Sequence, residues 1–387
     1  MNTKHCFITI LCSIALVACF AGAGSDARAQ GISVSTYELT DLGSFPGQKI
    51  AGSTATAINT MGEVTGISGR FAFCYDSNEK EPMEKLGGSL AGIARAFAMN
   101  DNDEVVGDFT FRKSEFVSRA ALFYKGGVLG LGALDDGSHF PNYSRANGIN
   151  SLGQVVGFSG PQFDGTNSRA FLWSKATGMF DIGTLGGAYA QAFAINDAGF
   201  VTGNSQLKSK VGAVHGFIYD SSGFKGFAKM RDLGTLGGSY SYGTFINGKN
   251  TVVGYSTTDN YDNRIHAFLL NDSGKMRDLG SLGGKTMKSD QSFALGVNGA
   301  DEVVGYTYLP AGPEMKVPQQ VAFIFMKGAM MNLNDLIGGA SKSYWLQSAV
   351  AINDKGQIAA NALDYSTGRV HAVLLTPTGI YTDVDTN

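Results

Sequence analysis

The sequence predicts an all-β protein built as a closed ring of seven similar units. A short phrase recurs in it, since "MRDLGTLGG" at 230–238 returns as "MRDLGSLGG" at 276–284. An apolar residue followed by Asn also recurs seven times, with spacings of 41, 50, 46, 51, 51 and 55 residues. Repeats of about 40–50 residues are typical of β-propeller blades or of paired helices. Helical periodicity is missing and short β-rich runs separated by Gly recur, so the interpretation is a seven-bladed β-propeller.

One unit shows the four strands expected of a blade. "AFAIN" at 192–196 is a first strand, and "FVTGNS" at 200–205 is a second one. After a variable loop, "HGFIYD" at 215–220 is a third strand and "MRDLGTL" at 230–236 a fourth. Four antiparallel strands make one propeller blade.

The turn between the first two strands explains the repeated Asn, whose copies are Asn59, Asn100, Asn150, Asn196, Asn247, Asn298 and Asn353. A short hairpin loop of this kind needs a residue that tolerates left-handed backbone at its end, which favours Gly, Asn or Asp. The seven loops end in Gly62, Asp103, Gly153, Gly199, Asn250, Asp301 and Gly356. The Asn side chain is expected to bond the backbone two residues on. A ring of ligand-binding asparagines is the alternative.

The strand count predicts how the ring closes. Fourth strands of the "DLG" type number eight, and the extra one, at 37–43, precedes the first complete unit. We expect that N-terminal strand to complete the last blade beside 371–375, which leaves no open sheet edge between the first and last blades. A weaker strand at 379–384 is then spare or competes for the same place.

Composition and the leader set the broad class. Charged residues make up 16% of the 387 residues, there are 53 Gly, and the net charge is −3, so the basic footprint of a nucleic-acid-binding protein is absent. Residues 1–29 are interpreted as a signal peptide that ends in an A-x-A site, and 30–387 as a single propeller domain. "LVAC" at 16–19 is the competing interpretation, a lipobox that would lipid-anchor the chain through Cys19. In both cases the protein is exported, to the periplasm or outside the cell.

The repeat resembles that of a known group, the bacterial extracellular HAF repeat family, named for a His-Ala-Phe step. Here the step is His266-Ala267-Phe268, with the variants Arg169-Ala170-Phe171 and His215-Gly216-Phe217. The "DLGTLGG", "AIN" and "VVG" phrases complete the likeness over 37–384. The resemblance implies export and a repeat fold, and it implies no catalytic residues.

One position varies where the frame around it repeats. It lies five residues before each Asn, and its occupants are Thr54, Arg95, Arg145, Gln191, Tyr242, Phe293 and Ser348. We expect it to begin the innermost strand, at the mouth of the central channel on the face of the long loops. Tyr and Arg favour binding surfaces, so the candidate ligand-binding residues are Arg95, Arg145, Gln191, Tyr242, Tyr189 and Tyr240. No acid stands at the position, which predicts a locally basic mouth, and an ordinary solvated loop is the alternative.

The remaining polar residues favour structural roles. The His or Arg before Ala-Phe is expected to pair with the "DLG" Asp of the next strand, as in Arg169/Asp181, His215/Asp232 and His266/Asp278, and not to form a cationic ring. His371 is expected to meet Asp41 or Asp383. "DNYDNR" at 259–264 offers Asp259 and Asp262 as weak Ca²⁺ candidates. No cofactor motif stands in the right context.

These observations predict an exported binding or interaction module for a glycan, a peptide or another anionic or polyhydroxylated ligand, with no nucleic-acid partner and no transmembrane span. The alternative is a propeller enzyme, a lyase or hydrolase that acts on polysaccharide. Basic and aromatic residues break the repeat but no acid–base pair does, which favours binding.

Overall fold

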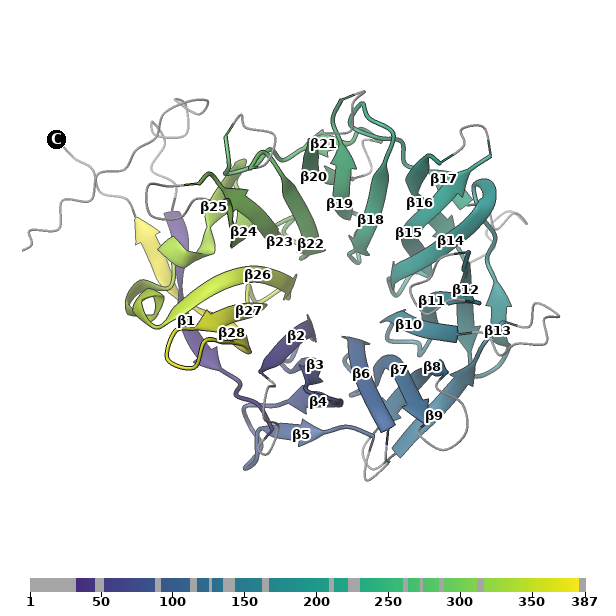
Figure 1. Cartoon of the computed structure of the whole chain (residues 1–387), viewed down its shortest axis with the longest axis horizontal. Helices are drawn as coiled ribbons and strands as arrows, with labels where there is room; N and C mark the ends of the chain where they lie inside the picture. Colours follow the sequence, from purple (N-terminus) through teal and green to yellow (C-terminus); the bar gives the residue numbers. More distant parts are fainter. Residues whose placement is uncertain are drawn as a thin grey trace, which may run out of the picture.

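The computed structural model describes residues 33–45, 52–87, 92–111, 117–124, 127–134, 143–161, 167–208, 212–221, 230–259, 264–271, 274–284, 289–311 and 317–382. These residues form seven four-stranded antiparallel sheets arranged as blades around one axis (Figure 1). The all-β, seven-bladed prediction is confirmed. The expected leader at 1–29 and its lipobox lie outside the described residues.

The two inner strands of each blade lie nearest the axis (Figure 1). The innermost strands are β2 (Ser53–Ile58), β6 (Gly92–Met99), β10 (Tyr143–Ile149), β14 (Gly186–Ile195), β18 (Ser241–Ile246), β22 (Ser292–Val297) and β26 (Tyr344–Ile352). The second strands are β3 (Val64–Ser68), β7 (Val105–Phe111), β11 (Val155–Gly160), β15 (Phe200–Leu207), β19 (Val252–Thr257), β23 (Val303–Leu309) and β27 (Ile358–Asp364).

The two outer strands complete each blade. The third strands are β4 (Phe71–Tyr75), β8 (Ser118–Tyr124), β12 (Arg169–Ser174), β16 (Val214–Asp220), β20 (Ile265–Leu270), β24 (Gln319–Met326) and β28 (Arg369–Thr382). The outermost strands are β5 (Met83–Lys85), β9 (Gly127–Gly132), β13 (Gly178–Asp181), β17 (Met230–Asp232), β21 (Arg277–Asp278), β25 (Ala329–Asn332) and β1 (Ser33–Asp41). Two 3₁₀ turns, η2 (Leu333–Asp335) and η3 (Gly338–Lys342), precede β26. No helix in the described part of the chain is both long enough and apolar enough to cross a membrane.

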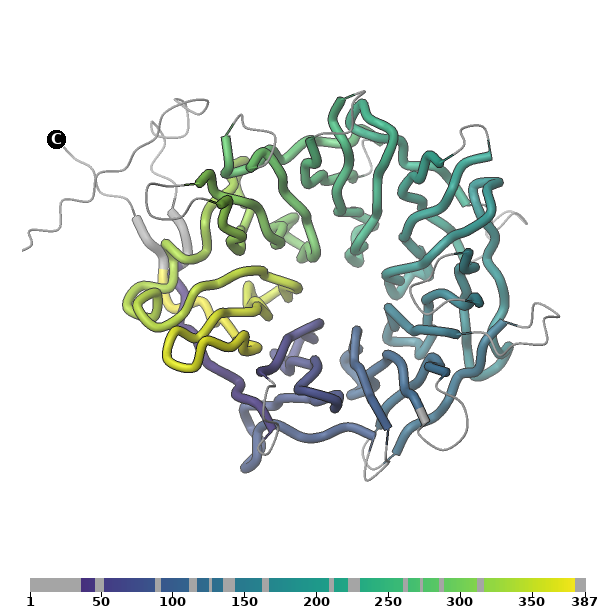
Figure 2. Tube along the Cα trace, viewed as in Figure 1, coloured from purple at the N-terminus to yellow at the C-terminus, as the bar shows by residue number. Residues whose placement is uncertain are grey.

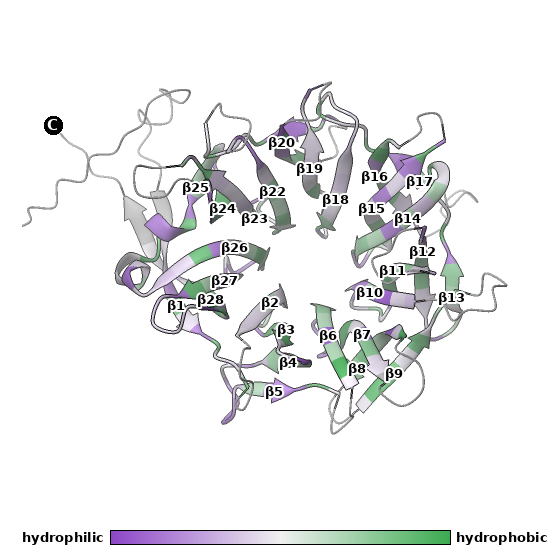
Figure 3. Cartoon of the chain, viewed as in Figure 1, coloured by the Kyte–Doolittle hydropathy of each residue, from purple (hydrophilic) through white to green (hydrophobic). Residues whose placement is uncertain are grey.

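The apolar core lies between the blades and not along the axis. Seven clusters of buried apolar side chains occur among the described residues, and each joins two adjoining blades. The Phe of the "AF" step lies in five of them, for example Phe171 between the second and third blades and Phe268 between the fourth and fifth. The second and seventh repeats have Ala121 and Val373 at this position. Hydrophobic residues are accordingly spread over the strands of every blade (Figure 3). Burial of this repeated side chain is therefore what stacks one repeat on the next.

The Gly of the "VVG" step is needed because the two inner strands of a blade approach closely at this residue. Every innermost strand has an irregularity of register near its middle. It brings a carbonyl over the Gly of the second strand, so a Cβ at Gly107 would lie 1.8 Å from the Arg95 oxygen, and one at Gly254 would lie 1.8 Å from the Tyr242 oxygen. No side chain fits at that distance. In the seventh blade Ala360 takes this place, and β26 has a second irregularity between Leu346 and Ser348.

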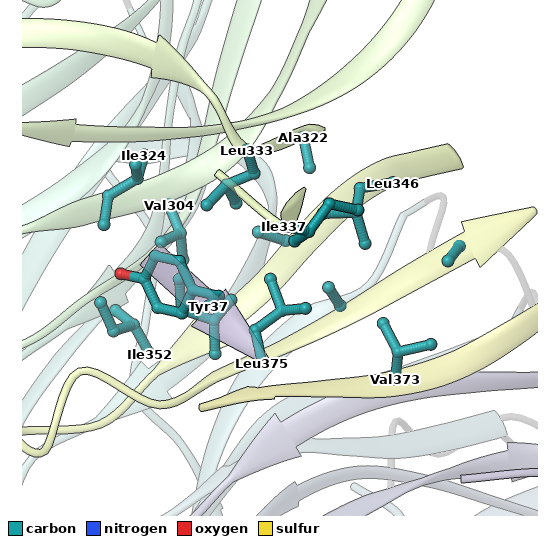
Figure 4. Close-up of a cluster of buried hydrophobic side chains, with 14 of the residues drawn as sticks. Tyr37, Val304, Ala322, Ile324, Leu333, Ile337, Leu346, Ile352, Val373 and Leu375 are labelled. Atoms are coloured by element: carbon teal, nitrogen blue, oxygen red, sulfur yellow. The ribbon is translucent and has the colours of Figure 1, made fainter. Parts of the chain in front are cut away.

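The N-terminal strand closes the ring as predicted. β1 pairs with β28 as the outermost strand of the seventh blade, with Leu39 opposite Leu375. The chain therefore meets itself where the purple and yellow ends of the tube run together (Figure 2). Tyr37 is buried in the cluster between the sixth and seventh blades, among Val304, Leu333 and Leu375 (Figure 4).

The expectation for 379–384 needs correction. Residues 379–382 are neither spare nor in competition with β1, because β28 runs on without a turn and pairs Gly379 with Thr36 and Thr382 with Ser33. The two ends of the chain thus extend one ladder together, with a bulge between Thr36 and Tyr37. The remaining residues, 383 and 384, lie outside the described part.

The repeated asparagines link neighbouring blades as well as shaping their turns. Each is buried, and its Oδ1 accepts backbone N–H bonds within its own turn, as Asn353 does from Lys355 and Gln357 at 3.1 and 3.0 Å. Its Nδ2 donates to the carbonyl of the next repeated Asn in six cases, which include the step across the closure from Asn353 to Asn59 at 3.0 Å. Turn chemistry is confirmed, and burial removes these side chains from ligand contact.

Candidate functional site

A belt of paired side chains surrounds the axis at one level. Each innermost strand contributes the variable residue five before its Asn, and each second strand contributes the residue opposite. The fourteen members, which we call the axial belt, are the pairs Thr54–Ile67, Arg95–Asp108, Arg145–Phe158, Gln191–Asn204, Tyr242–Tyr255, Phe293–Tyr306 and Ser348–Asn361.

In β2, β18 and β22 the belt residue is the second residue of its strand, close to the expected place at the entry. In β6, β10, β14 and β26 it lies further inside, because residues after the crossover already pair, as Gly92 does with Phe111 and Gly186 with Leu207. The second-strand members were not predicted from the sequence. A signal for them exists, since each directly follows the "VVG"-type step and varies between repeats as its partner does.

The second and third blades hold a charged sector. Arg95 donates from Nε and Nη2 to the two carboxylate oxygens of Asp108 at 2.7 and 2.8 Å, and Arg145 of the next blade donates from Nε to Asp108 at 3.1 Å. The Asp108 side chain is 1% exposed, whereas the two arginines are 23% and 24% exposed. This acid from the second strand was missing from the expectation of a basic mouth, and the three charges sum to +1.

Arg145 is held on several sides. Its guanidinium lies over the Phe97 ring at 4.8 Å and over the Phe158 ring at 5.4 Å. Burial lowers the Arg145 pKa from its ordinary value, while the Asp108 charge opposes that shift and Arg95 adds to it. Bonding to a fixed carboxylate and stacking on two rings together pre-orient the guanidinium plane.

The fifth and sixth blades hold an aromatic sector. Tyr242 stacks on Tyr255 at 4.8 Å between ring centroids, and Phe293 stacks on Tyr306 at 4.7 Å. Tyr255 meets Phe293 of the next blade edge-on at 5.0 Å, so the four rings form one continuous arc. Burial raises the pKa of Tyr306 to about 12, with the neighbouring Tyr308 adding to the shift. These hydroxyls therefore stay protonated and neutral near pH 7.

The predicted loop tyrosines lie beside this arc. Tyr189 and Tyr240 stand two residues before the belt position of their blades, one step nearer to the long-loop face. Burial raises the Tyr189 pKa, and Tyr242 and Tyr240 are close enough to add to the shift. The structure thus brings Tyr189, Tyr240 and Tyr242 into one neighbourhood, while Arg95 and Arg145 belong to another sector.

Amides occupy two of the three blades between these sectors, and the first blade holds Thr54 and Ile67. In the fourth blade Gln191 faces Asn204, whose Oδ1 is buried and finds no hydrogen-bond partner among the described residues. In the seventh blade Asn361 is satisfied, because its Oδ1 accepts from the Ala55 N–H at 2.8 Å. An unmade buried hydrogen bond costs about 1–3 kcal/mol. The side-chain oxygen of Asn204 therefore lacks a stabilising hydrogen bond that the side-chain oxygen of Asn361 has.

The four pairs predicted for His and Arg residues of the third strands are present, away from the belt. Arg169 bonds Asp181, His215 bonds Asp232, His266 bonds Asp278 and His371 bonds Asp41, all at 2.8–2.9 Å. Among the described residues no group of three His, Cys, Asp or Glu is placed to hold a metal ion. Asp259 lies just after β19, and Asp262 lies outside the described residues.

His266 contacts two carboxylates, one through each ring nitrogen. Its Nδ1 contacts Asp278 and its Nε2 contacts Asp290 at 3.0 Å, which joins the fifth blade to the residues before β22. Burial lowers the His266 pKa, but the hydrogen bonds and charges of the two carboxylates outweigh that effect, and the net shift is upward.

Comparisons with known proteins agree with the fold. A family model described as "Protein of unknown function (DUF3466)" matches residues 186–382, just over half of the chain. No curated protein matches the chain significantly in sequence. A puromycin hydrolase mutant is similar in structure, with a TM-score of 0.51, 10% identity and coverage of 87% of this chain and 55% of that one.

Two further structures are more distant. The β-propeller domain of the Trilobed protease from Pyrococcus furiosus has a TM-score of 0.47 and 9% identity over 87% of this chain and 100% of that one. A structure described as the extracellular domain of a one component system from B. thetaiotaomicron has a TM-score of 0.42 and 10% identity over 90% of this chain and 40% of that one. At 10% identity the likeness to the puromycin hydrolase mutant supports the fold alone.

Proposed function

The chain belongs to the family described as protein of unknown function (DUF3466), and we propose that it is a binding module whose ligand is held by the axial belt on the long-loop side. The observation that carries the proposal is the division of the belt into unlike sectors. A belt with a purely structural role would repeat from blade to blade, as the "VVG" glycines and "AF" phenylalanines do. This one changes from charged to amide to aromatic side chains around the ring.

The two most distinctive sectors lie on opposite sides of the ring. β6 and β10, which carry the arginines, face β18 and β22, which carry the aromatic arc, across the axis (Figure 1). Arginine favours anionic groups and tyrosine offers both a flat apolar surface and a hydroxyl. A ligand that spans the axis would therefore meet a cationic side, an aromatic side and amides between them. Glycans and peptides carry such groups together.

Binding is favoured over catalysis by the chemistry of the belt. Glycoside hydrolysis commonly needs two carboxylic acid side chains, one as general acid and the other as base or nucleophile. The general acid or base must also lie within reach of the proton that it transfers. Asp108 is the only acid of the belt, and it is held by two guanidinium groups with its side chain buried. The belt therefore offers recognition without an acid–base pair.

The proposed place of action is outside the cytoplasm. The leader at 1–29, the lipobox cysteine Cys19 and the resemblance to HAF repeats, all seen in the sequence, support export either as a free or as a lipid-anchored protein. Fractionation of cells that express the full chain tests this proposal. Recovery of the protein from the cytoplasm alone, with its leader intact, would contradict it.

A binding experiment tests the site. Purified protein is screened on a glycan and peptide array, and ligands found there are measured by calorimetry against Tyr242→Ala and Tyr124→Ala. Tyr124 is 50% exposed on β8, outside the belt, and serves as the matched control. We expect Tyr242→Ala to weaken binding about tenfold, since stacking contacts are worth about 0.5–1.5 kcal/mol, and Tyr124→Ala to leave it unchanged. Equal affinity of both variants and the parent would refute the site.

A further inference from the structure

We infer that the ligand of the axial belt is an oligosaccharide whose sugar rings carry carboxylate groups. The inference rests on the proposed binding function and adds the chemical class of the ligand. It follows from the charged sector, the aromatic sector and their arrangement around one axis.

The charged sector is suited to one negative charge. Arg95, Asp108 and Arg145 sum to +1, and the two arginines remain partly exposed while Asp108 does not. A guanidinium has five N–H donors in a plane, so it can hold Asp108 and a further acceptor together. A carboxylate carries one charge and fits the guanidinium fork, whereas a phosphate monoester carries about −1.5 to −2 at pH 7.

Pre-organisation strengthens this match. Asp108 fixes the Arg95 fork through two bonds, and Phe97 and Phe158 hold the Arg145 plane. Little side-chain freedom remains to be lost when an anion arrives, and immobilising a mobile side chain otherwise costs about 0.5–1.5 kcal/mol. Partial burial also strengthens each charged hydrogen bond.

The aromatic and amide sectors favour a sugar as the carrier of that carboxylate. The arc from Tyr242 to Tyr306 offers flat apolar surface together with neutral hydroxyls. Gln191 and Asn204 stand between this arc and Arg145. A sugar ring has apolar C–H faces and a rim of hydroxyls that suits such a mixture. Because the sectors lie on different blades around the axis, a chain of several sugars would engage more of them than a single ring.

The test uses acidic oligosaccharides and the same molecules without their charge. Tetramers of galacturonate, mannuronate and guluronate are titrated into the full-length protein by calorimetry, each beside its fully methyl-esterified form. We expect at least one free acid to bind about tenfold or more tightly than its ester, with an affinity that falls as salt is added. The Arg145→Met variant should lose this preference while it keeps the Arg95–Asp108 pair. Arg169→Met, which removes an ion-paired arginine from the third strand of the third blade, should retain it.

Each outcome separates the two proposals. Equal binding of acids and esters, or an acid preference that Arg145→Met leaves intact, overturns the assignment of a carboxylate ligand and leaves the binding site standing. If the array selects only neutral glycans or only peptides, the assignment of a carboxylate ligand is likewise overturned while the binding site is kept. Failure of every glycan and peptide on the array overturns the binding function itself. Circular dichroism of both variants establishes that a loss of binding is not a loss of fold.

Discussion

Removal of both belt arginines should destabilise the fold strongly, because Asp108 depends on them. Its side chain is 1% exposed and accepts from Arg95 at 2.7 and 2.8 Å and from Arg145 at 3.1 Å. The double variant Arg95→Ala/Arg145→Ala leaves this carboxylate buried without the bonds that hold its charge. Removal of a partner from a buried ion pair typically costs about 3–5 kcal/mol. The double variant should therefore lose about 3–5 kcal/mol of unfolding free energy at pH 7 relative to the parent.

Urea unfolding followed by tryptophan fluorescence and circular dichroism measures this loss. The triple variant Arg95→Ala/Asp108→Asn/Arg145→Ala is the control, and it should recover most of the stability at pH 7. If the double variant unfolds at the same urea concentration as the parent, the buried ion-pair interpretation of the belt is wrong.

Three further outcomes can be checked by the same unfolding assay. Tyr37→Ala should lower the free energy of unfolding by about 3–5 kcal/mol, as for other large aromatic side chains in a core. Tyr365→Ala removes an exposed ring and should lower it little, so equal effects of the two changes would contradict closure by β1. Asn353→Ala should lower the free energy of unfolding by about 1–3 kcal/mol, because it removes buried hydrogen bonds across the closure and within the turn. Asn78→Ala changes an exposed residue and should cause no measurable loss. An unaltered urea midpoint for Asn353→Ala would show that the ring of asparagines is not needed for stability. His266 has a raised pKa, so its ion pairs contribute fully below its solution pKa of about 6.5 and are lost as pH rises through the higher folded value; the stability difference between the parent and His266→Gln should therefore shrink between about pH 6 and pH 9, and a difference that grows over this range would refute the sign.

The periodic part of the structure could be predicted from the sequence. The repeated Asn and the left-handed residues that follow it indicated the hairpins, and the surplus "DLG" strand indicated closure by β1. Both depend on turn chemistry and strand counting, which are local. The pairs of His266 with Asp278 and of Arg169 with Asp181 were also predictable, because adjacent strands of one repeat bring them together in a fixed register.

The sequence by itself therefore determined the number of blades, the order of the strands and the position that varies within each repeat. Tertiary structure alone decided what that position contacts. Asp108 comes from the second strand of one blade and bonds Arg145 on the first strand of the next, and Tyr255 meets Phe293 in the same way. These contacts depend on how one twisted sheet stacks on its neighbour, and the buried phenylalanines lie in the apolar clusters between the two sheets. For this reason a mouth that was predicted to be locally basic has one buried acid, Asp108, between its two arginines.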